Sequence, residues 1–567
     1  MTTPTSGATM TSNNGGAARR TLRTVVRATA ALGVAAAGLT ACSSTKSTAP
    51  STASKPSTCQ APSGWQSVTA SAVGTPATDY TLTSFDGTKI RMHWFPNANS
   101  STAAPMPTVL MGPGWGQAGD TNTGAVGLLG SLSIGDLWKA GFNVMTWDPR
   151  GFGASDGVVE VDSVDFEAKD VSNIISWIAT QPGVTLDRPG VPRIGMVGGS
   201  YGGGIQFVTA ATDCRVDAIA PTIAWNSLET SLFKNQTVKS GWSGILSQVA
   251  TTHTLDPHVT AANEEQKSNG TASQASVDFF VSRGPGELLR KVKVPTLLLE
   301  GTVDDLFTLA EAVANYEVLT KQGTTTSMAW FCGGHGVCLT DPGTTIDVGA
   351  MSVNWMRRYV KGDVAAPVLK GFEFVDQNGV AYLAPSFPPA SGPPITGAGS
   401  GTLALTDGGG SGPAMISSPS STAGVVGSVA RAVSPGEASH AVNVDVVITQ
   451  DAMIAGTPKV SLTYSGSSPK GTKPTRVFAQ LVDPATHIVV GNQITPIPVI
   501  LDGASHTLMM PLEMIGFAAA KGSHLTLQLV ATTVAYSTPR LGGSLDFTKI
   551  NLTIPTVTGV TRATTAR

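Results

Sequence analysis

From about residue 78 to residue 365, short apolar runs alternate with longer segments whose apolar residues recur at helical spacing. In the segment 166–181, Val171, Ile174 and Ile178 repeat every three to four residues, which predicts an amphipathic helix. Alternating strands and helices imply a parallel sheet covered on both faces, with ligand sites at the carboxyl ends of its strands. We expect strands within 108–116, 141–153, 193–199, 216–223 and 294–305, and further helices within 202–212, 310–319 and 348–360.

Two parts of the chain depart from this pattern. Residues 226–290 are mainly helical and contain no clear buried strand, so we expect a cap inserted over the strand ends within the α/β domain 65–365. Residues 366–567 alternate or run apolar in short stretches between Gly, Pro and Ser turns, which is typical of an antiparallel sandwich. Segments 388–402 and 406–424 are rich in Gly, Ser and Pro and predict loops. We expect strands at 443–449, 458–466, 476–483, 487–492 and 524–533.

The first 41 residues have the composition of a signal peptide. Arginines between positions 19 and 27 precede a short Ala-rich stretch, which is too short for a permanent membrane span. The Leu-Thr-Ala-Cys sequence ending at Cys42 resembles a bacterial lipobox, so we expect cleavage before Cys42, a lipid on its thiol and an exported, membrane-anchored protein. The paired arginines also resemble a twin-arginine signal, which leaves the export route open. Residues 42–64, rich in Ser, Thr and Pro, predict a tether.

Composition favours an exported protein with an uncharged polar surface. Only 13% of the residues are charged, about half the usual share, and the formal net charge is −2. Nothing in this balance indicates a nucleic-acid partner, and we expect membrane contact only through the lipid. Besides Cys42, an even number of cysteines remains, which suits disulfides in an oxidising compartment. We expect Cys332 to pair with its near neighbour Cys338, and Cys59 then to pair with Cys214.

The segment RIGMVGGSYGGGIQ places glycines on both sides of Ser200. Residues 198–202 fit the G-x-S-x-G nucleophile elbow, in which a sharp strand-to-helix turn raises the serine hydroxyl above the sheet. Large side chains two residues before or after the serine would collide in such a turn. The motif alone is weak, because a chain with 64 glycines contains about one match by chance. The apolar strand before it and the helix after it strengthen the interpretation of Ser200 as a nucleophile.

A nucleophilic serine needs a histidine base and a carboxylate that orients the base, and in this fold class they follow the serine in the order acid, then histidine. His335 lies between glycines after an apolar strand, whereas the other histidines precede the serine or fall in the cap or the sandwich. Asp304 follows the strand at 294–301 and is favoured as the acid. We expect its neighbour Asp305 to be solvated or bonded to backbone, and Glu300 is less well placed.

An acyl-transfer site also needs two N–H donors for the oxyanion. The backbone of Tyr201, directly after the serine, supplies one, and we expect Trp115 to supply the other, with Gly116 as the alternative. The candidates for a substrate pocket are Trp225, Trp242 and Phe331, each of which could equally belong to the core. The candidates for binding a free substrate amine are Glu229, Glu264 and Glu265, although glutamates are commonly just solvated.

At these residues the chain resembles the family of X-Pro dipeptidyl-peptidases and cocaine-esterase-like hydrolases, the S15 peptidase family, over roughly 78–560. The resemblance implies an α/β-hydrolase with a helical cap and a C-terminal jelly-roll, in which Ser200 is the nucleophile, Asp304 the acid and His335 the base. Pro113 stands where many relatives have His, which implies a differently shaped oxyanion loop. The motifs that carry the resemblance are GWG at 114–116, WDPRGFGASDG at 147–157, WIATQP at 177–182, GGSYGG at 198–203, GTVDDLF at 301–307 and GGH at 333–335.

The sequence therefore predicts an exported serine hydrolase that cleaves an ester or peptide substrate through an acyl-enzyme intermediate. An acyl esterase is favoured, an X-Pro dipeptidyl-peptidase is the alternative, and a non-catalytic surface-binding lipoprotein is a third possibility. We expect no metal or organic cofactor, because the chain has neither a zinc-like Cys/His spacing nor a nucleotide-binding fingerprint. The oligomeric state stays open.

Overall fold

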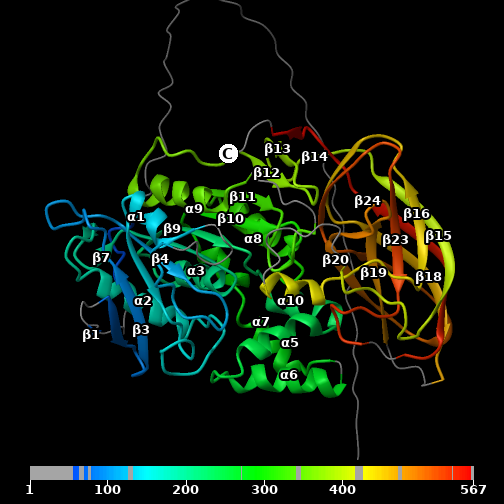
Figure 1. Ribbon diagram of the computed structural model, residues 1–567, viewed down its shortest axis with the longest axis horizontal. Coiled ribbons are helices and arrows are strands. Elements are labelled where there is room, and N and C mark those ends of the chain that lie inside the picture. Colours follow the sequence, from blue (N-terminus) through cyan, green and yellow to red (C-terminus); the bar gives the residue numbers. More distant parts are fainter. Residues whose placement is uncertain are drawn as a thin grey trace, which may run out of the picture. The chain divides into compact units, whose positions relative to one another are not determined.

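The computed structural model describes residues 55–62, 69–74, 78–124, 132–269, 271–339, 346–414, 425–469, 475–538 and 541–563 (Figure 1). The predicted signal peptide, the lipidation site Cys42 and the first part of the predicted tether lie outside these residues. No helix in the described part of the chain is long and apolar enough to cross a membrane.

A twelve-stranded sheet organises the α/β part of the molecule, in the order β1-β2-β3-β5-β4-β8-β9-β10-β11-β12-β13-β26. The central strands run parallel: β5 (Asn143–Trp147), β4 (Thr108–Gly112), β8 (Ile194–Gly199), β9 (Val216–Thr222), β10 (Thr296–Gly301), β11 (Thr326–Phe331) and β12 (Phe372–Val375). Antiparallel strands extend both edges: β1 (Ala70–Val73), β2 (Asp79–Thr83) and β3 (Lys89–Phe95) on one side, β13 (Ala381–Ala384) and β26 (Thr561–Arg562) on the other.

Both faces of the parallel strands are buried, which explains their continuous apolar runs. On β4, Leu110 packs into one core, whereas Val109 and Met111 point into the core of the opposite face. The first face is covered by α2 (Glu167–Ile178), α3 (Tyr201–Thr212) and α8 (Leu309–Lys321). The second face is covered by α1 (Ile134–Lys139) and α9 (Val348–Met356). This is the α/β-hydrolase arrangement that the sequence predicts, and it is confirmed.

The predicted cap is helical and enters the chain between β9 and β10. It consists of α4 (Leu228–Leu232), η2 (Lys234–Gln236), α5 (Ser240–Val249), α6 (Pro257–Asn269), α7 (Gln274–Val281) and η3 (Gly286–Lys291). A helix from the C-terminal half of the chain, α10 (Val425–Val433), lies beside α5 in Figure 1 and shares the apolar core of the cap through Ala430 and Val433.

The C-terminal part is a β-sandwich of two four-stranded antiparallel sheets around one apolar core. One sheet contains β15 (Ile395–Ala404), β24 (Ser544–Ile554), β18 (Lys459–Ser467) and β21 (Asp502–Pro511). The other contains β16 (Ala441–Val447), β23 (His524–Val530), β19 (Thr475–Asp483) and β20 (Ile488–Val499). A smaller sheet joins β14 (Ala390–Ser391), β25 (Val557–Thr558), β17 (Ala452–Gly456) and β22 (Ile515–Ala519).

The boundary predicted between residues 365 and 366 is wrong. Strands β12 and β13 follow that boundary but extend the large sheet, where Met328 of β11 pairs with Phe372 of β12. Phe372 and Phe374 belong to the core of the α/β part. Because β26 near the C-terminus also pairs with β13, the chain leaves the large sheet for the sandwich and then returns to it.

The loop predicted at 388–402 is also wrong over most of its length, because β15 occupies it. Its glycines alternate with period two, and Gly397, Gly399 and Gly401 all face β16. A Cβ at any of the three would approach a valine methyl of β16 to within 2.6–2.8 Å. The glycines therefore let the two sheets of the sandwich pack closely, and their abundance does not mark a loop.

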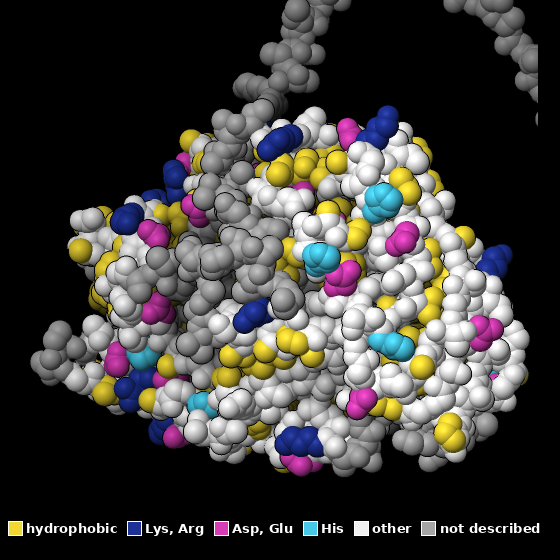
Figure 2. Space-filling model, turned by 45° about the vertical axis from the view of Figure 1, so that its right-hand side comes forward, with side chains coloured by type: hydrophobic (Ala, Val, Ile, Leu, Met, Phe, Trp, Pro, Cys, Tyr) yellow, Lys and Arg dark blue, Asp and Glu magenta, His cyan; other side chains and the backbone are white. Residues whose placement is uncertain are grey.

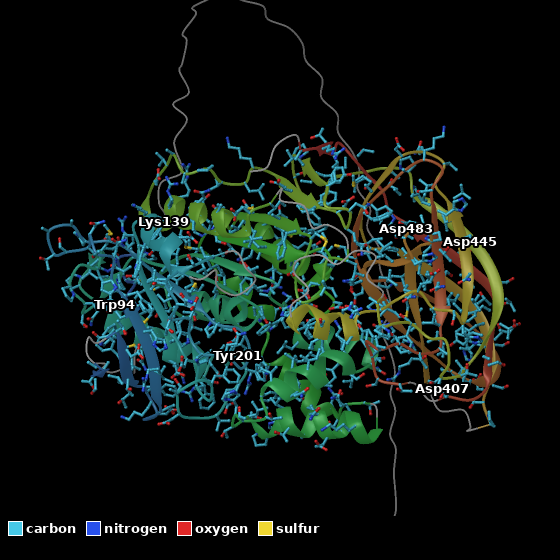
Figure 3. The ribbon with its side chains drawn as sticks, in the orientation of Figure 1. Trp94, Lys139, Tyr201, Asp407, Asp445 and Asp483 are labelled. Atoms are coloured by element: carbon cyan, nitrogen blue, oxygen red, sulfur yellow. A yellow bond between two sulfur atoms is a disulfide. The ribbon has the colours of Figure 1, made fainter. Side chains whose placement is uncertain are left out.

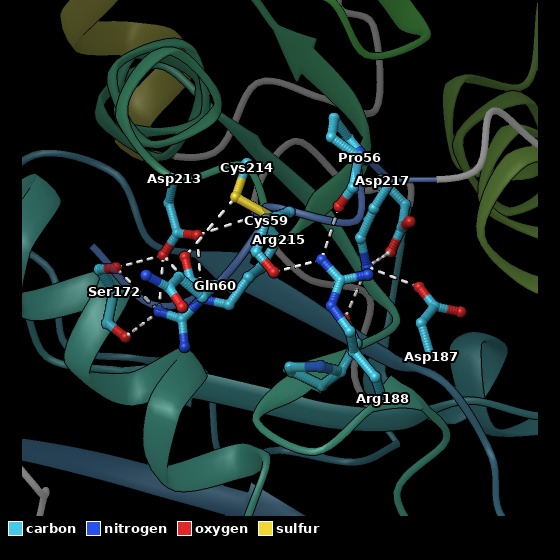
Figure 4. The surroundings of a disulfide bond; sticks show 12 residues. Pro56, Cys59, Gln60, Ser172, Asp187, Arg188, Asp213, Cys214, Arg215 and Asp217 are labelled. Atoms are coloured by element: carbon cyan, nitrogen blue, oxygen red, sulfur yellow. Dashed lines mark hydrogen bonds and ion pairs between the residues drawn. A yellow bond between two sulfur atoms is a disulfide. The ribbon is translucent and has the colours of Figure 1, made fainter. Parts of the chain in front are cut away.

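The last part of the predicted tether 42–64 is not a free linker. Cys59 forms a disulfide with Cys214, which follows α3 (Figure 4). Beside it, the buried Lys55 ammonium lies 2.7 Å from a carboxylate oxygen of Asp217. The Arg188 guanidinium also donates to the carbonyls of Pro56 and Cys59. A Ser/Thr/Pro-rich segment has no core of its own, so the disulfide, the ion pair and these hydrogen bonds attach it to the α/β part.

Backbone atoms and side chains that are neither hydrophobic nor charged dominate the described part of the face drawn in Figure 2. Lys, Arg, Asp and Glu side chains are scattered over it singly or in small groups between wide areas of other atoms. This agrees with the charged content of 13%, and no extended basic surface is visible on this face.

Candidate active site

Ser200 lies at the sharp turn between β8 and α3, at the carboxyl end of the parallel strands. Its backbone has φ 57° and ψ −118°, a conformation that few non-glycine residues adopt, and its N–H donates to the Thr222 carbonyl at 2.9 Å. A Cβ on Gly198 would lie 2.7 Å from the Gly112 carbonyl oxygen of β4, and one on Gly202 would overlap the same carbonyl. The flanking glycines thus make room for the neighbouring strand, and this contact keeps the turn against β4.

A continuous chain of hydrogen bonds joins the serine to a buried carboxylate. Ser200 Oγ lies 2.8 Å from His335 Nε2, and His335 Nδ1 lies 2.8 Å from Asp304 Oδ2. The same Oδ2 accepts from the His335 backbone N–H at 2.8 Å, while Oδ1 accepts from the N–H groups of Leu306 and Phe307 at 2.9 and 2.8 Å. The Asp304 carboxylate is therefore fixed on both oxygens. This geometry suits a serine whose proton passes to an oriented imidazole.

The loop that carries His335 is held at both ends. It follows β11 and is closed by the disulfide between Cys332 and Cys338. From the sandwich, Asn492 Nδ2 donates to the Val337 carbonyl at 2.9 Å. The imidazole is thus presented on a short, covalently closed loop.

Asp305 does not behave as the sequence predicts. It is neither solvated nor bonded to backbone but buried, with Oδ1 accepting from Trp242 Nε1 at 2.8 Å and Oδ2 from Ser434 Oγ at 2.6 Å. Burial raises the pKa of Asp305 to about 6, although the Ser434 hydrogen bond opposes this effect. Glu300 is also fully buried, and its carboxylate accepts from the N–H of Gly301. Only Asp304 reaches the histidine ring.

Both predicted oxyanion donors lie beside Ser200. Tyr201 is the first residue of α3, where a backbone N–H has no intrahelical partner. Trp115 belongs to a turn after β4 that is closed by a hydrogen bond from Gln117 N to Gly114 O at 3.2 Å. The rings of Trp115 and Tyr201 are 5.4 Å apart, and both residues line the same pocket as Ser200.

Two contacts fix the oxyanion loop from outside. The Trp115 indole N–H donates to the Leu246 carbonyl of α5 at 3.0 Å, and a carboxylate oxygen of Asp148 accepts from the Gly119 N–H at 2.8 Å. The loop is therefore tied to the cap at one point and to the end of β5 at another. In Figure 3, Tyr201 lies within the α/β part, well away from the labelled sandwich residues Asp407, Asp445 and Asp483.

A pocket opens at Ser200 between the α/β part and the cap. Among its described lining residues none is charged. Its apolar lining comprises Trp115, Val161, Tyr201, Trp225, Leu228, Leu232, Phe233, Val238, Leu246, Leu255, Val259, Ala262, Phe280, Leu306 and Phe307. Besides Ser200, its polar lining comprises Ser243, Ser247, Asn263 and Gln266.

Of the aromatic residues predicted for a pocket, only Trp225 lines this one. The prediction for Trp242 and Phe331 is wrong. Trp242 turns its indole toward Asp305 and His335, and Phe331 at the end of β11 packs into the core on the opposite face of the sheet. The pocket walls come mostly from cap helices, and the sequence gives no signal of how such helices pack.

None of the three glutamates proposed for binding a substrate amine lines the pocket. Glu229 and Glu264 are exposed, and Glu264 pairs with Lys267 at 2.9 Å. Glu265 accepts a hydrogen bond from the Ser273 N–H at 2.7 Å. The cap therefore directs these carboxylates elsewhere.

Comparison with known proteins agrees with this geometry. Residues 86–336, which include Ser200, Asp304 and His335, match the model of the family described as X-Pro dipeptidyl-peptidase (S15 family). The match covers the part of the chain that holds the candidate site, less than half of the 567 residues, and makes that part similar to the S15 peptidase family. Together with the hydrogen bonds that join Ser200, His335 and Asp304, this similarity indicates a serine hydrolase.

Two solved structures share the fold of this chain over most of its length. A CocE/NonD family hydrolase from Staphylococcus aureus has 14% sequence identity and a TM-score of 0.59, covering 87% of this chain and 96% of that chain. An alpha-amino acid ester hydrolase has 13% identity and a TM-score of 0.58, covering 88% and 97%. At sequence identities this low, the structural similarity shows that the fold is shared and shows nothing about activity.

Curated relatives match only in part. An uncharacterized 31.7 kDa protein from the traX-finO intergenic region of Escherichia coli is 38% identical over 87 residues, which are 15% of this chain and 29% of that protein. The chain spans less than half the length of the curated relatives it matches.

Proposed function

We propose that this S15-type hydrolase is a serine esterase whose preferred substrates carry an uncharged, largely apolar acyl group. The observation that carries the proposal is the pocket at Ser200, in which no described lining residue is charged. An apolar pocket favours a neutral hydrocarbon-rich group, because burying an unpaired charge there would be costly.

In the proposed mechanism, His335 Nε2 takes the proton of Ser200 Oγ as that oxygen attacks the ester carbonyl carbon. Asp304 stabilises the resulting imidazolium, and the backbone N–H groups of Tyr201 and Trp115 donate to the oxyanion. His335 then protonates the leaving alcohol as its bond to the carbonyl carbon breaks. A water molecule gives a proton to His335, attacks the acyl-serine and releases the acid, returning the proton to Ser200.

The alternative is an X-Pro dipeptidyl-peptidase, the activity after which the S15 family is described. Such an exopeptidase must bind the free ammonium group of its substrate, and a buried ammonium needs a carboxylate partner. Glu229, Glu264 and Glu265 do not face the pocket. This difference makes the esterase the better supported of the two.

A substrate panel tests the choice. We expect p-nitrophenyl butyrate and octanoate to be hydrolysed with kcat/KM values at least about 100-fold above those of Gly-Pro and Ala-Pro p-nitroanilides. Because the p-nitrophenolate of the esters is a better leaving group, a Gly-Pro p-nitrophenyl ester serves as the matched control. Preferential turnover of the Gly-Pro ester over the neutral esters would refute the proposed acyl preference.

We also propose that the enzyme is exported and held at the cell membrane by a lipid on Cys42. The lipobox-like sequence and the basic, Ala-rich leader motivate this proposal, and the pairing of Cys59 with Cys214 and of Cys332 with Cys338 supports an oxidising compartment. Replacing Cys42 by Ser should move the protein from the membrane fraction to the soluble fraction and abolish incorporation of a labelled fatty acid. Unchanged membrane association in this variant would contradict the lipid anchor.

A further inference from the structure

Two aromatic side chains contact the His335 imidazole but take no part in the hydrogen bonds that join Ser200, His335 and Asp304. The ring of Phe307 lies 4.9 Å away at an interplanar angle of 85°, and that of Trp242 lies 5.6 Å away at 81°. Asp304 holds only the Nδ1 edge of the imidazole. A tilt of the imidazole about that bond would carry Nε2 away from Ser200, and the two flanking rings restrict this tilt.

Trp242 itself is fixed by one hydrogen bond, which its Nε1–H donates to Asp305 Oδ1 at 2.8 Å. Asp305 in turn accepts from Ser434 Oγ, directly after α10, at 2.6 Å. All three residues are buried. The link thus connects the cap helix α5, the loop after β10 and the C-terminal half of the chain.

The buried ammonium of Lys239 lies close to this link. Its Nζ donates to the Leu306 carbonyl at 2.9 Å, one residue beyond Asp305. Asp305 is therefore buried near a cation, and its two oxygens accept from Trp242 and Ser434. Its position, and hence that of the indole, is set by the surrounding fold.

We propose that Asp305 is a positioning residue of the reaction, which holds the Trp242 indole against His335 and so keeps Nε2 aligned with Ser200. The inference rests on the proposed function, because it assigns a role in a reaction carried out by Ser200 and His335. This positioning role requires a hydrogen-bond acceptor at position 305 but does not require a negative charge there.

This distinction gives matched variants. Asp305→Ala removes the acceptor, whereas Asp305→Asn keeps one, because its amide oxygen still accepts from Trp242 and its NH₂ group donates to Ser434 Oγ. The Ser434 hydroxyl already lies 3.1 Å from the Ala430 carbonyl, to which it would then donate. Trp242→Phe keeps a ring beside His335 but removes the N–H donor.

We expect kcat for p-nitrophenyl butyrate to fall about tenfold in Asp305→Ala and in Trp242→Phe, with KM within twofold of wild type. Asp305→Asn should stay within twofold of wild type in both constants. Both changes break the same hydrogen bond between Trp242 and Asp305. The kcat of the double variant Asp305→Ala/Trp242→Phe should therefore fall no further than that of either single variant. Circular dichroism and thermal unfolding establish that each variant is folded.

A readout without turnover separates this inference from the proposed function. The low-field proton resonance of the His335 Nδ1–H···Asp304 hydrogen bond should shift or broaden in Trp242→Phe and remain in Asp305→Asn. A folded Trp242→Phe enzyme with wild-type kcat and an unchanged resonance would overturn the proposal, as would an Asp305→Asn variant as slow as Asp305→Ala. If the wild-type enzyme hydrolyses no ester, the proposed function fails. The positioning role is then judged by the resonance alone, and an unchanged resonance in folded Trp242→Phe would refute it.

Discussion

Two adjacent carboxylates, Asp304 and Asp305, have opposite surroundings. Asp304 accepts only N–H groups, three from the backbone and one from the His335 ring. Asp305 faces an indole and a hydroxyl, and its burial raises its pKa to about 6. A one-residue step along the loop after β10 therefore separates a carboxylate that is hydrogen-bonded to the histidine from one that is hydrogen-bonded to Trp242 and Ser434.

The first prediction concerns Asp304→Asn. An asparagine cannot accept hydrogen bonds on both atoms of its amide group, so either the histidine ring or the backbone donors lose their acceptor. We expect kcat for p-nitrophenyl butyrate to fall about 10⁴-fold, as when a triad histidine is held in the wrong tautomer. Asp305→Asn is the matched control and should remain near wild type. A loss of less than tenfold in Asp304→Asn would contradict the role of this carboxylate.

The sequence could place the residues that follow simple chain order. A glycine-flanked serine after a strand, an acid after a later strand and a histidine after the next one all lie at one edge of a parallel sheet, which predicts Ser200, Asp304 and His335. The directions of Trp242 and Phe331 could not be predicted, because an aromatic residue after a strand or in a cap helix packs wherever the tertiary fold leaves space.

At the scale of elements, loops fastened at several points position the candidate active site. The disulfide of Cys332 and Cys338 closes the histidine loop. On the other side, His93 of β3 lies between two carboxylates, with Nδ1 2.9 Å from Asp79 and Nε2 3.1 Å from Asp148. Asp148 also holds the oxyanion loop, so the first strands of the sheet contribute to the geometry around Ser200.

The second prediction concerns the double variant Cys332→Ser/Cys338→Ser. Opening a loop this short should reduce the free energy of unfolding by about 2 kcal/mol and lower kcat, because His335 loses its constraint. The variant Cys59→Ser/Cys214→Ser is the control, since its disulfide lies outside the pocket: it should lose stability but keep kcat. Steady-state kinetics and chemical denaturation measure both effects. Equal effects of the two double variants on kcat would argue against the positioning role of the histidine loop.

The third prediction concerns pH. Burial lowers the pKa of His93, but hydrogen bonds to Asp148 and Asp79 outweigh it and raise the pKa above the ordinary 6.5. A raised pKa in the folded state means that protonation stabilises the fold below about pH 6.5, and that this contribution disappears as the pH rises through the raised value.

The stability advantage of wild type over His93→Gln should therefore be largest near pH 6 and shrink toward pH 9. Denaturation midpoints measured across this range test it. A difference that is constant with pH would mean that His93 contributes by packing alone.

At the scale of the whole molecule, the sandwich supports the loop that carries the acid. Gln493 Nε2 of β20 donates to the Asp304 carbonyl at 2.7 Å, and the Thr308 hydroxyl donates to Glu513 at 3.0 Å. Glu513 is buried and lies 3.0 Å from Lys234 of the cap. The sandwich, the cap and the acid loop thus meet around an ion pair between the buried Glu513 and the half-buried Lys234.

The fourth prediction concerns Glu513→Gln. Removing one partner of a buried ion pair leaves the other charge uncompensated, so the free energy of unfolding should fall by about 3 kcal/mol. Glu287→Gln is the control, because the Glu287 and Arg290 pair is exposed and should contribute little. Denaturant unfolding followed by tryptophan fluorescence measures both. Equal stability of Glu513→Gln and wild type would show that the sandwich does not depend on this contact.

The overall architecture was predictable, because strand and helix periodicities differ clearly between the two parts of the chain. Its exceptions arise where distant segments meet. Strand β26 joins the large sheet from near the C-terminus, which no local pattern indicates. The glycines of β15 do carry a signal, an alternation with period two, but their composition is also that of a loop. The pocket depends on how cap helices pack, which is a tertiary property.

The central claim is that the Ser200 hydroxyl is an activated nucleophile. The most direct measurement is labelling of the folded protein with a fluorophosphonate probe, followed by peptide mass spectrometry to locate the adduct. We predict one adduct per chain, on Ser200, which is absent in Ser200→Ala and formed much more slowly in His335→Ala. Folded wild-type protein that acquires no adduct, or acquires it on another residue, would contradict the account.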